Sequence, residues 1–199
     1  MRAPHAAGRG DEPAVAVRKG NKELPTNLSG IMAGSEPVEE NYTRAELVGV
    51  YGVVHRYGGT RYFYGAVMLL RGEDWGEQVL PIYIGSAEAE AIARAVHGIP
   101  TQRPMTHDLL VSMLGALGVR VERVTIDALI SDVYTATVVL AQEINGEVKR
   151  HYIDARPSDS VAIAVRTGAP IYINNRLRRY ARSESEFFRD FGKVEREKI

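Results

Sequence analysis

The 199-residue sequence contains no cysteine. Disulfide bonds, thiolate zinc sites, iron–sulfur clusters and a cysteine nucleophile are therefore excluded. Any metal ion that the protein binds must be held by Asp, Glu or His side chains.

Long apolar runs are also absent. No stretch approaches the ~20 uninterrupted apolar residues that a membrane-spanning helix needs. Residues 1–10 form a polar run rich in Ala, Gly and Arg, without the apolar block of a secretory signal. We therefore expect no membrane partner and a cytoplasmic location.

The chain has no net charge, because Lys and Arg number 25 and Asp and Glu number 25. It offers no overall field that would attract nucleic acid or anionic lipid. Residues 44–173 carry 12 basic against 14 acidic side chains, whereas residues 174–199 carry 8 against 5. This basic C-terminal segment can follow phosphates, but a mixture of charges around phenylalanines is more typical of the solvated face of a surface helix.

Several catalytic motifs are missing as well. The sequence has no G-x-x-x-x-G-K-[ST] loop, no G-x-G-x-x-G, no H-E-x-x-H and no G-x-S-x-G. Nucleotide triphosphatases, dinucleotide oxidoreductases, zincins and α/β-hydrolases therefore lack their local signatures.

The composition divides the chain into three parts. Residues 1–43 combine prolines, glycines and mixed charge with little aliphatic periodicity, which predicts a disordered arm. Residues 44–175 form the expected folded domain. Residues 176–199 predict a charged amphipathic C-terminal helix, in which the apolar positions are Leu177, Tyr180, Phe187, Phe188, Phe191 and Val194.

Within the domain, β-branched and aromatic runs predict strands and alanine-rich segments predict helices. The expected strands are a hairpin over 44–70, a short strand at 78–85, a three-stranded meander over 119–155 with a turn at Asn145-Gly146, and a final strand at 169–174. The expected helices are 86–98, 106–118 and 157–168, with Ser86 and Thr106 as caps and Pro157 or Ser158 at the start of the third. This order predicts an α+β fold, a mixed and mainly antiparallel sheet with Ala-rich helices packed on it.

Polar side chains gather where the strand at 147–155 runs into a helix. Asp154, Arg156, Ser158 and Asp159 lie there, and helix N-termini favour anions and converging side chains. These residues can bind a metal or a phosphate. An ordinary structural role as helix caps and a local ion pair is equally open.

Two further helix starts carry ionisable groups. Thr106, His107 and Asp108 open one helix, where His107 can act as a base or simply be exposed. Glu88 and Glu90 lie near the start of another, where acidic residues are favourable without any function.

Three separated blocks carry a family resemblance: LPIYIGSAEAEAIARAVHG at 80–98, RPMTHDLL at 103–110 and IDARPSDSVAIAVRTGAPIYI at 153–173. In this order and spacing they resemble the bifunctional nuclease family over about residues 45–175, roughly two-thirds of the chain. The resemblance implies a compact α+β domain that self-associates, with activity on both RNA and DNA.

Combined with the clustered residues, the resemblance favours metal-assisted hydrolysis of RNA or single-stranded DNA. Mg²⁺ or Mn²⁺ would be held by Glu90, Asp154 and Asp159, with Arg156 as phosphate clamp and His107 with Asp108 as acid and base. Thr106 and Ser158 complete the expected binding residues. The alternative is a non-catalytic module that binds an anion or a partner protein.

We also expect a homo-oligomer, with a dimer favoured. The motivation is the aromatic and aliphatic run RYFYGAVMLL at 61–70, which has more apolar surface than one small sheet face easily hides. The resemblance points the same way.

Overall fold

The computed structural model describes residues 41–57, 60–190 and 197–198. Most of the predicted arm, 1–43, lies outside the described residues, and the first strand begins within its last residues at Tyr42. In the part of the chain that is described, no helix is long and apolar enough to cross a membrane.

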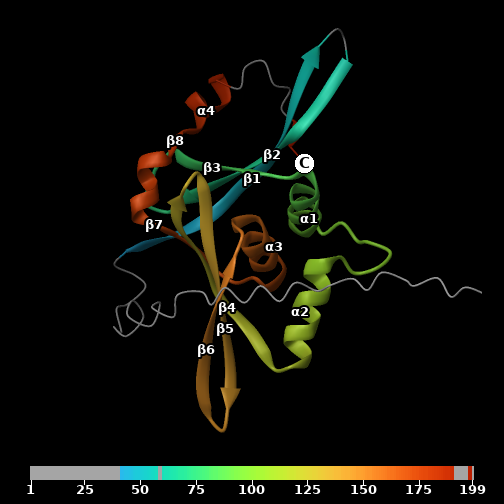
Figure 1. The fold of residues 1–199 in the computed structure, drawn as a ribbon, viewed down its shortest axis with the longest axis vertical. Helices are drawn as coiled ribbons and strands as arrows, with labels where there is room; N and C mark the ends of the chain where they lie inside the picture. Colours follow the sequence, from blue (N-terminus) through green and yellow to red (C-terminus); the bar gives the residue numbers. More distant parts are fainter. Residues whose placement is uncertain (1–40, 58–59, 191–196, 199) are drawn as a thin grey trace, which may run out of the picture. The chain divides into compact units, whose positions relative to one another are not determined.

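The strands join one mixed sheet in the order β6-β5-β4-β7-β1-β2-β3-β8, with β9 paired to β1 (Figure 1). Only the β4–β7 pair is parallel among the described strands. The expected hairpin and meander are confirmed as β1–β2 and β4–β5–β6. The bounds are β1 Tyr42–Tyr57, β2 Thr60–Gly72, β3 Gln78–Ile84, β4 Val119–Ile130, β5 Val133–Ile144, β6 Glu147–Ala155, β7 Ile171–Asn174, β8 Arg182–Ser183 and β9 Glu197–Lys198.

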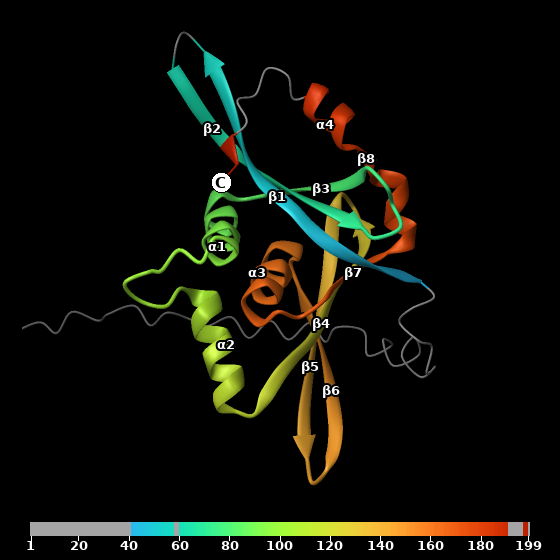
Figure 2. The ribbon, with the colours of Figure 1, turned by 180° about the vertical axis from the view of Figure 1, so that it is seen from behind.

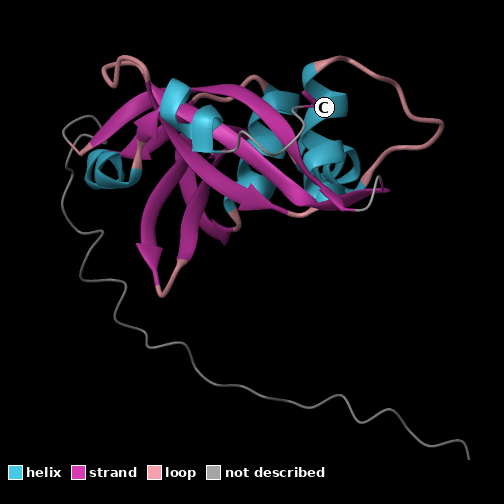
Figure 3. Ribbon diagram, turned by 90° about the horizontal axis from the view of Figure 1, so that it is seen from above, coloured by secondary structure: helices cyan, strands magenta, loops and turns pink. Residues whose placement is uncertain are grey.

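Three helices lie on the face of the sheet that carries the main hydrophobic core. They are α1 (Ser86–Val96), α2 (Thr106–Ala116) and α3 (Pro157–Thr167). α1 packs against α3 and against β1 and β2, and α3 packs against β4 and β5. α2 contacts α3 and β4 and lies to the outer side of α3 (Figure 2). Figure 3 shows the helices grouped against the twisted strands. The predicted α+β fold is therefore confirmed.

The alternation of side chains along β2 fills two cores. Ala66, Met68 and Leu70 point into the main core beneath α1 and α3, whereas Val67 and Leu69 point to the opposite face, because successive side chains of a strand alternate. All five are at most 1% exposed. This part of the run at 61–70 is thus buried inside one chain, so it cannot supply the apolar surface expected to drive dimerisation.

The C-terminal segment differs from the single amphipathic helix predicted over 176–199. The structure has a 3₁₀ helix at Asn175–Tyr180, the short strand β8 and a seven-residue helix α4 at Glu184–Asp190. The Asn174 side chain accepts a hydrogen bond from the Arg176 N–H and starts the 3₁₀ turn, and pairing of β8 with β3 keeps residues 182–183 extended. Residues 191–196 and 199 of the predicted helix lie outside the described part.

The helix starts lie one residue earlier than predicted. Gly85 and Met105 are the capping residues of α1 and α2, so Ser86 and Thr106 are the first helical residues rather than caps. Pro157 is the first residue of α3, as expected. As a result, each helix carries a carboxylate at its third position, Glu88 in α1, Asp108 in α2 and Asp159 in α3.

Candidate functional site

The starts of α1 and α3 are joined by Arg156, the residue that precedes α3. Its guanidinium donates from Nε and Nη2 to the Asp159 carboxylate at 2.8 and 3.2 Å. Nη1 donates to Oε1 of Glu88 at 2.9 Å. Arg156 therefore ties two N-terminal carboxylates together, a geometry that suits its planar, multiple donors.

The start of α2 joins the same group through His107. Its Nε2 lies 3.1 Å from Oδ1 of Asp159. Partial burial alone would raise the pKa of Asp159, yet the hydrogen bonds from Arg156 and His107 outweigh it and hold that pKa below its ordinary value. An ionised carboxylate only accepts hydrogen bonds, so Nε2 carries the hydrogen and a neutral ring has its lone pair on Nδ1. Glu88, His107, Arg156 and Asp159 form what we call the ionic cluster.

Arg156 is the most exposed member of the ionic cluster. Its side chain is 66% exposed, against 30% for Asp159 and 15% for His107. The hydrogen bonds that Arg156 donates to Asp159, together with the negative charge of Asp159, raise the pKa of Arg156 above its usual value. Three of the five guanidinium N–H groups are engaged with Asp159 and Glu88, which leaves two N–H groups to donate to a ligand.

A hollow of about 360 Å³ lies beside the ionic cluster. Glu88 and Arg156 form part of its wall, and Tyr83, Val133 and Tyr134 form another part. Tyr83 and Val133 are 65% and 64% exposed. The hollow therefore combines a cationic group with aromatic and apolar surface, as ligand sites commonly do. The predicted binding residue Ser158 also lines it, although Ser158 is only 6% exposed.

Asp108 follows His107 in the chain but bonds elsewhere. Oδ1 accepts from Nε of Arg166 on α3 at 2.5 Å, and Oδ2 accepts from the Met105 N–H at 2.8 Å. The hydrogen bond from Arg166, followed by that from Met105, lowers the pKa of Asp108. Asp159, rather than Asp108, is thus the carboxylate hydrogen-bonded to His107. The predicted binding residue Thr106 is exposed at the first position of α2.

The residues predicted as metal ligands are not brought together. Glu90 is exposed and pairs with Arg94 one turn along α1, at 2.8–2.9 Å. Asp154 is exposed on β6 opposite Thr137. Within residues 41–57, 60–190 and 197–198, no three His, Asp or Glu side chains form a group that could hold a metal ion. The described residues therefore do not fit a preformed metal centre.

Residue Glu88, rather than Glu90, is the α1 carboxylate that belongs to the ionic cluster. Glu88 folds back over the helix start, where a Cβ at position 85 would collide with its Oε2; glycine at that position leaves the space. The sequence did offer one signal for Glu88: a carboxylate at the third position of a helix can fold back toward the helix start. Tyr83 and Tyr134, separated by about 50 residues in the sequence, had no comparable signal.

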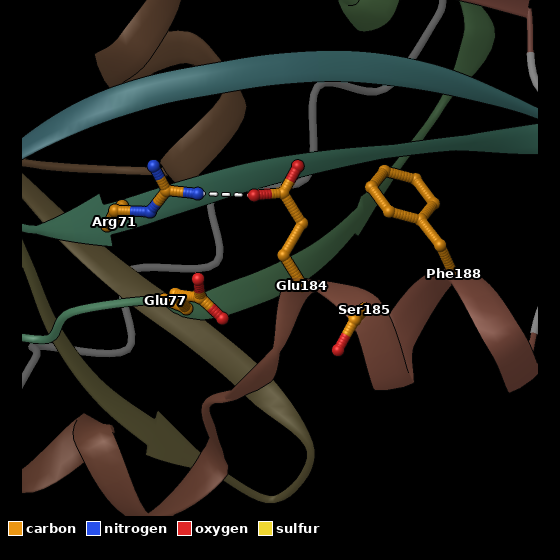
Figure 4. Close-up of a pocket in the computed structure, with 5 residues that line it drawn as sticks. All are labelled: Arg71, Glu77, Glu184, Ser185 and Phe188. Atoms are coloured by element: carbon orange, nitrogen blue, oxygen red, sulfur yellow. Dashed lines mark hydrogen bonds and ion pairs between the residues drawn. The ribbon is translucent and has the colours of Figure 1, made fainter.

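A second hollow, of about 610 Å³, lies near α4 and is lined by Arg71, Glu77, Glu184, Ser185 and Phe188 (Figure 4). Arg71 on β2 pairs with Glu184 at the start of α4 and with Glu46 on β1. Two carboxylates therefore compensate its charge. The pairing fastens α4 to the sheet, which indicates a structural role.

Fold and site together define the class: an α+β domain with a mixed sheet, in which three helix starts meet in an ionic cluster beside an open hollow. A sequence model described as "Bifunctional nuclease domain" matches residues 68–186. The chain belongs to the bifunctional nuclease domain family, and the resemblance noted in the sequence is confirmed. The match includes all four residues of the ionic cluster.

Several proteins resemble the chain over 54% to 66% of its length. An uncharacterized protein of Mycobacterium tuberculosis H37Rv is 43% identical over 107 residues, which are 54% of this chain and 60% of that protein. Bifunctional nuclease 1 of Oryza sativa subsp. indica is 29% identical over 110 residues, 55% of this chain and 33% of that protein. Bifunctional nuclease 2 of Arabidopsis thaliana is 26% identical over 132 residues, 66% of this chain and 39% of that protein. The chain thus matches about a third to three-fifths of the length of these relatives.

Proposed function

We propose that the protein is a nuclease that hydrolyses phosphodiester bonds of RNA and single-stranded DNA at the ionic cluster. The observation that carries the proposal is the connection of an exposed guanidinium, Arg156, to an imidazole, His107, through one carboxylate, Asp159. Phosphoryl-oxygen binding and proton transfer are the two operations that such a reaction needs. The nuclease names of the plant relatives support the same activity.

In this mechanism the free N–H groups of Arg156 donate to the non-bridging phosphate oxygens and stabilise the charge that builds on them. Nδ1 of His107 accepts a proton from the attacking water while the water oxygen bonds to phosphorus. The P–O bond to the leaving nucleoside breaks, and the leaving oxygen takes a proton from solvent. Asp159 acts as a positioning residue because it fixes the ring through Nε2.

The hollow supplies the preference for single strands. An unpaired base can stack on an exposed aromatic ring, an interaction that contributes ~1–3 kcal/mol per base and tolerates any sequence. Tyr83 is exposed and lines the same hollow as Glu88 and Arg156. A base in a duplex is already stacked and paired, so it cannot enter without the cost of being extruded.

The mechanism above does not use a divalent ion, and the cleavage assay tests whether the reaction requires one. Glu90 and Asp154 do not join Asp159 in a common site among the described residues. No step above is therefore assigned to Mg²⁺ or Mn²⁺. A cytoplasmic site of action is likewise part of the proposal, and localisation of the full chain tests it.

A second function has one observation in its favour. Arg156 is already paired with two carboxylates, so local pairing can consume the charge that catalysis requires. In that case the domain is a non-catalytic module that binds an anion or a partner through the same corner. Such a module would need Arg156 but tolerate Asp159→Asn, whereas the nuclease would not.

The test is cleavage of end-labelled single-stranded RNA and DNA by highly purified protein in Mg²⁺, in Mn²⁺ and in EDTA. Arg156→Ala is expected to lower kcat/KM by ~10²-fold or more, the typical loss for one charge-stabilising donor. Arg94→Ala removes another arginine that is paired with a carboxylate of α1, Glu90, outside the ionic cluster. It controls for loss of a surface charge and is expected to retain the wild-type rate. Equal rates for wild type and Arg156→Ala would overturn the proposal.

A further inference from the structure

The hollow beside the ionic cluster contains a carboxylate that the mechanism above does not use. Asp132 lines this hollow together with Tyr83 and Arg156. It is exposed and lies in the two-residue turn that joins β4 to β5. Among the described residues, none forms a hydrogen bond or an ion pair with the Asp132 side chain. Asp132 therefore offers two acceptor oxygens to a ligand in the hollow.

The turn that carries Asp132 departs from the residue that its backbone favours. Ser131 and Asp132 have φ values of 49° and 63°. The turn between β5 and β6 has the same length and the same left-handed backbone, with φ values of 54° at Asn145 and 82° at Gly146. Glycine is favoured at the second position of such a turn because it has no Cβ. A side chain at position 132 is thus present against the local backbone preference, and an outlier of this kind beside a hollow points to a function for that side chain.

The strand register sets the spacing between Arg156 and Asp132. Ala136 on β5 lies opposite Ala155 on β6. Arg156 is the next residue and is still extended, so it lies about level with position 135. Asp132 is three residues further along, which is ~10 Å in the strand direction. This spacing is comparable with the span from the phosphate of a nucleotide to the outer edge of its base. The carboxylate also repels a phosphate at Arg156 only weakly, because ~10 Å is the screening length in 0.1 M salt.

We propose that the hollow is a guanine-nucleotide subsite. Arg156 donates to the phosphate, the base stacks on Tyr83, and the Asp132 carboxylate accepts hydrogen bonds from the ring N1–H and the amino N2–H of guanine. The volume of about 360 Å³ suits one nucleotide, since sites for small ligands usually have ~300–1,000 Å³. The inference rests on the proposed function in its use of Arg156 as the phosphate-binding group, and it adds which base the protein selects.

The chemistry of a free carboxylate selects guanine among the common bases. Only guanine presents two adjacent donors on its Watson–Crick edge. Adenine and cytosine place one amino group beside an acceptor nitrogen, and uracil and thymine place one N–H between two carbonyl oxygens. A carboxylate only accepts hydrogen bonds, so each of these bases sets an acceptor against it. Stacking on Tyr83 tolerates any base, and Asp132 therefore supplies the discrimination.

The first experiment measures binding of guanosine, inosine and adenosine monophosphate to the full chain by calorimetry in EDTA. These nucleotides contain no phosphodiester bond, so the result does not depend on nuclease activity. Guanosine monophosphate is expected to bind ~10-fold or more tightly than adenosine monophosphate, the effect of one good two-point contact. Inosine monophosphate lacks the amino group and is expected to lie between them. Equal Kd values, or no detectable binding, would overturn this inference and leave the nuclease proposal standing. A guanine preference in a protein that cleaves nothing would overturn the nuclease proposal alone.

The second experiment assigns the preference to Asp132. Asp132→Asn removes the charge and one acceptor, and asparagine tolerates the left-handed backbone. Asp132→Gly removes the side chain and suits the turn, so both variants are expected to fold. In both, the Kd for guanosine monophosphate is expected to rise to about that of adenosine monophosphate, which stays unchanged. Asp154→Asn, which alters an exposed carboxylate on β6 that does not line the hollow, is expected to keep the preference. A guanine preference that survives both changes at position 132 would contradict the inference.

Discussion

Nε2 of His107 lies 3.1 Å from Oδ1 of Asp159, although the two residues are 52 positions apart in the sequence. The contact joins the first turn of α2 to the first turn of α3. Asp159 also holds Arg156, so a single carboxylate sets the positions of both the imidazole and the guanidinium. The candidate site is therefore organised around Asp159.

Asp159→Asn tests this organising role. The amide keeps the shape of the side chain but removes the negative charge that fixes the hydrogen on Nε2 of His107. We expect kcat for single-stranded substrates to fall by ~10-fold or more, and KM to change much less. Steady-state kinetics on folded variant protein measure the two constants. An unchanged kcat would remove Asp159 from the mechanism.

Glu88 and Glu90 provide a matched pair on one helix. Glu88 bonds to Arg156, whereas Glu90 pairs outward with Arg94. Glu88→Gln removes a negative charge beside the phosphate-binding guanidinium, and one charge at about 4 Å contributes ~1 kcal/mol in a solvated setting. We expect KM for single-stranded DNA to fall several-fold in Glu88→Gln and to stay constant in Glu90→Gln. Identical KM values for the two variants would count against the placement of the site.

The Asp108–Arg166 pair predicts a dependence of stability on pH. Folding lowers the pKa of Asp108, first through the Arg166 hydrogen bond and then through the Met105 N–H. Its stabilising contribution is therefore complete above the unfolded pKa of ~3.9 and is lost as the pH falls through the lower folded value. Urea denaturation from about pH 5 to about pH 2 should show a smaller loss of unfolding free energy in Asp108→Asn than in the wild type. The exposed control Asp154→Asn should keep the wild-type slope, and a wild-type slope for Asp108→Asn would contradict the pairing.

Phe187 tests whether α4 belongs to the folded domain. The side chain is 2% exposed and packs with Val67, Leu69 and Val79 on the face of the sheet opposite α1 and α3. Phe187→Ala is expected to lower the free energy of unfolding by ~3–5 kcal/mol because it leaves a cavity. Tyr180→Ala, at a position 37% exposed, should cost much less. Equal and small losses in thermal unfolding would show that α4 contributes little to the fold.

The sequence predicted the strands and the helices of the core because their signals are local. The β-branched and aromatic runs of the hairpin and the Asn145-Gly146 turn each lie within a short stretch of sequence. The prediction of one C-terminal helix was wrong because its extended residues 182–183 are set by pairing with β3, about 100 residues earlier. The propensities of neighbouring residues carry no information about a pairing strand so far away in the sequence.

The candidate site was predictable in part for the same reason. Arg156 and Asp159 are three residues apart at a helix start, and the sequence marks both. Which carboxylate would meet His107 was decided by the packing of α2 on α3, and Asp108, its neighbour in the chain, meets Arg166 instead. The choice of Glu88 over Glu90 depended on which side of α1 faces Arg156. These are tertiary relationships, and composition or spacing does not determine them.

The most direct test of the nuclease account compares two histidine variants in one cleavage assay. His107→Gln removes the proposed base, whereas His97→Gln changes an exposed histidine at the end of α1 that is outside the ionic cluster. Both proteins are purified identically and assayed on labelled single-stranded RNA and DNA. The account predicts that His97→Gln retains the wild-type rate and that His107→Gln loses ~10²–10⁴-fold, the usual contribution of general acid–base catalysis. Equal cleavage by both variants would contradict it.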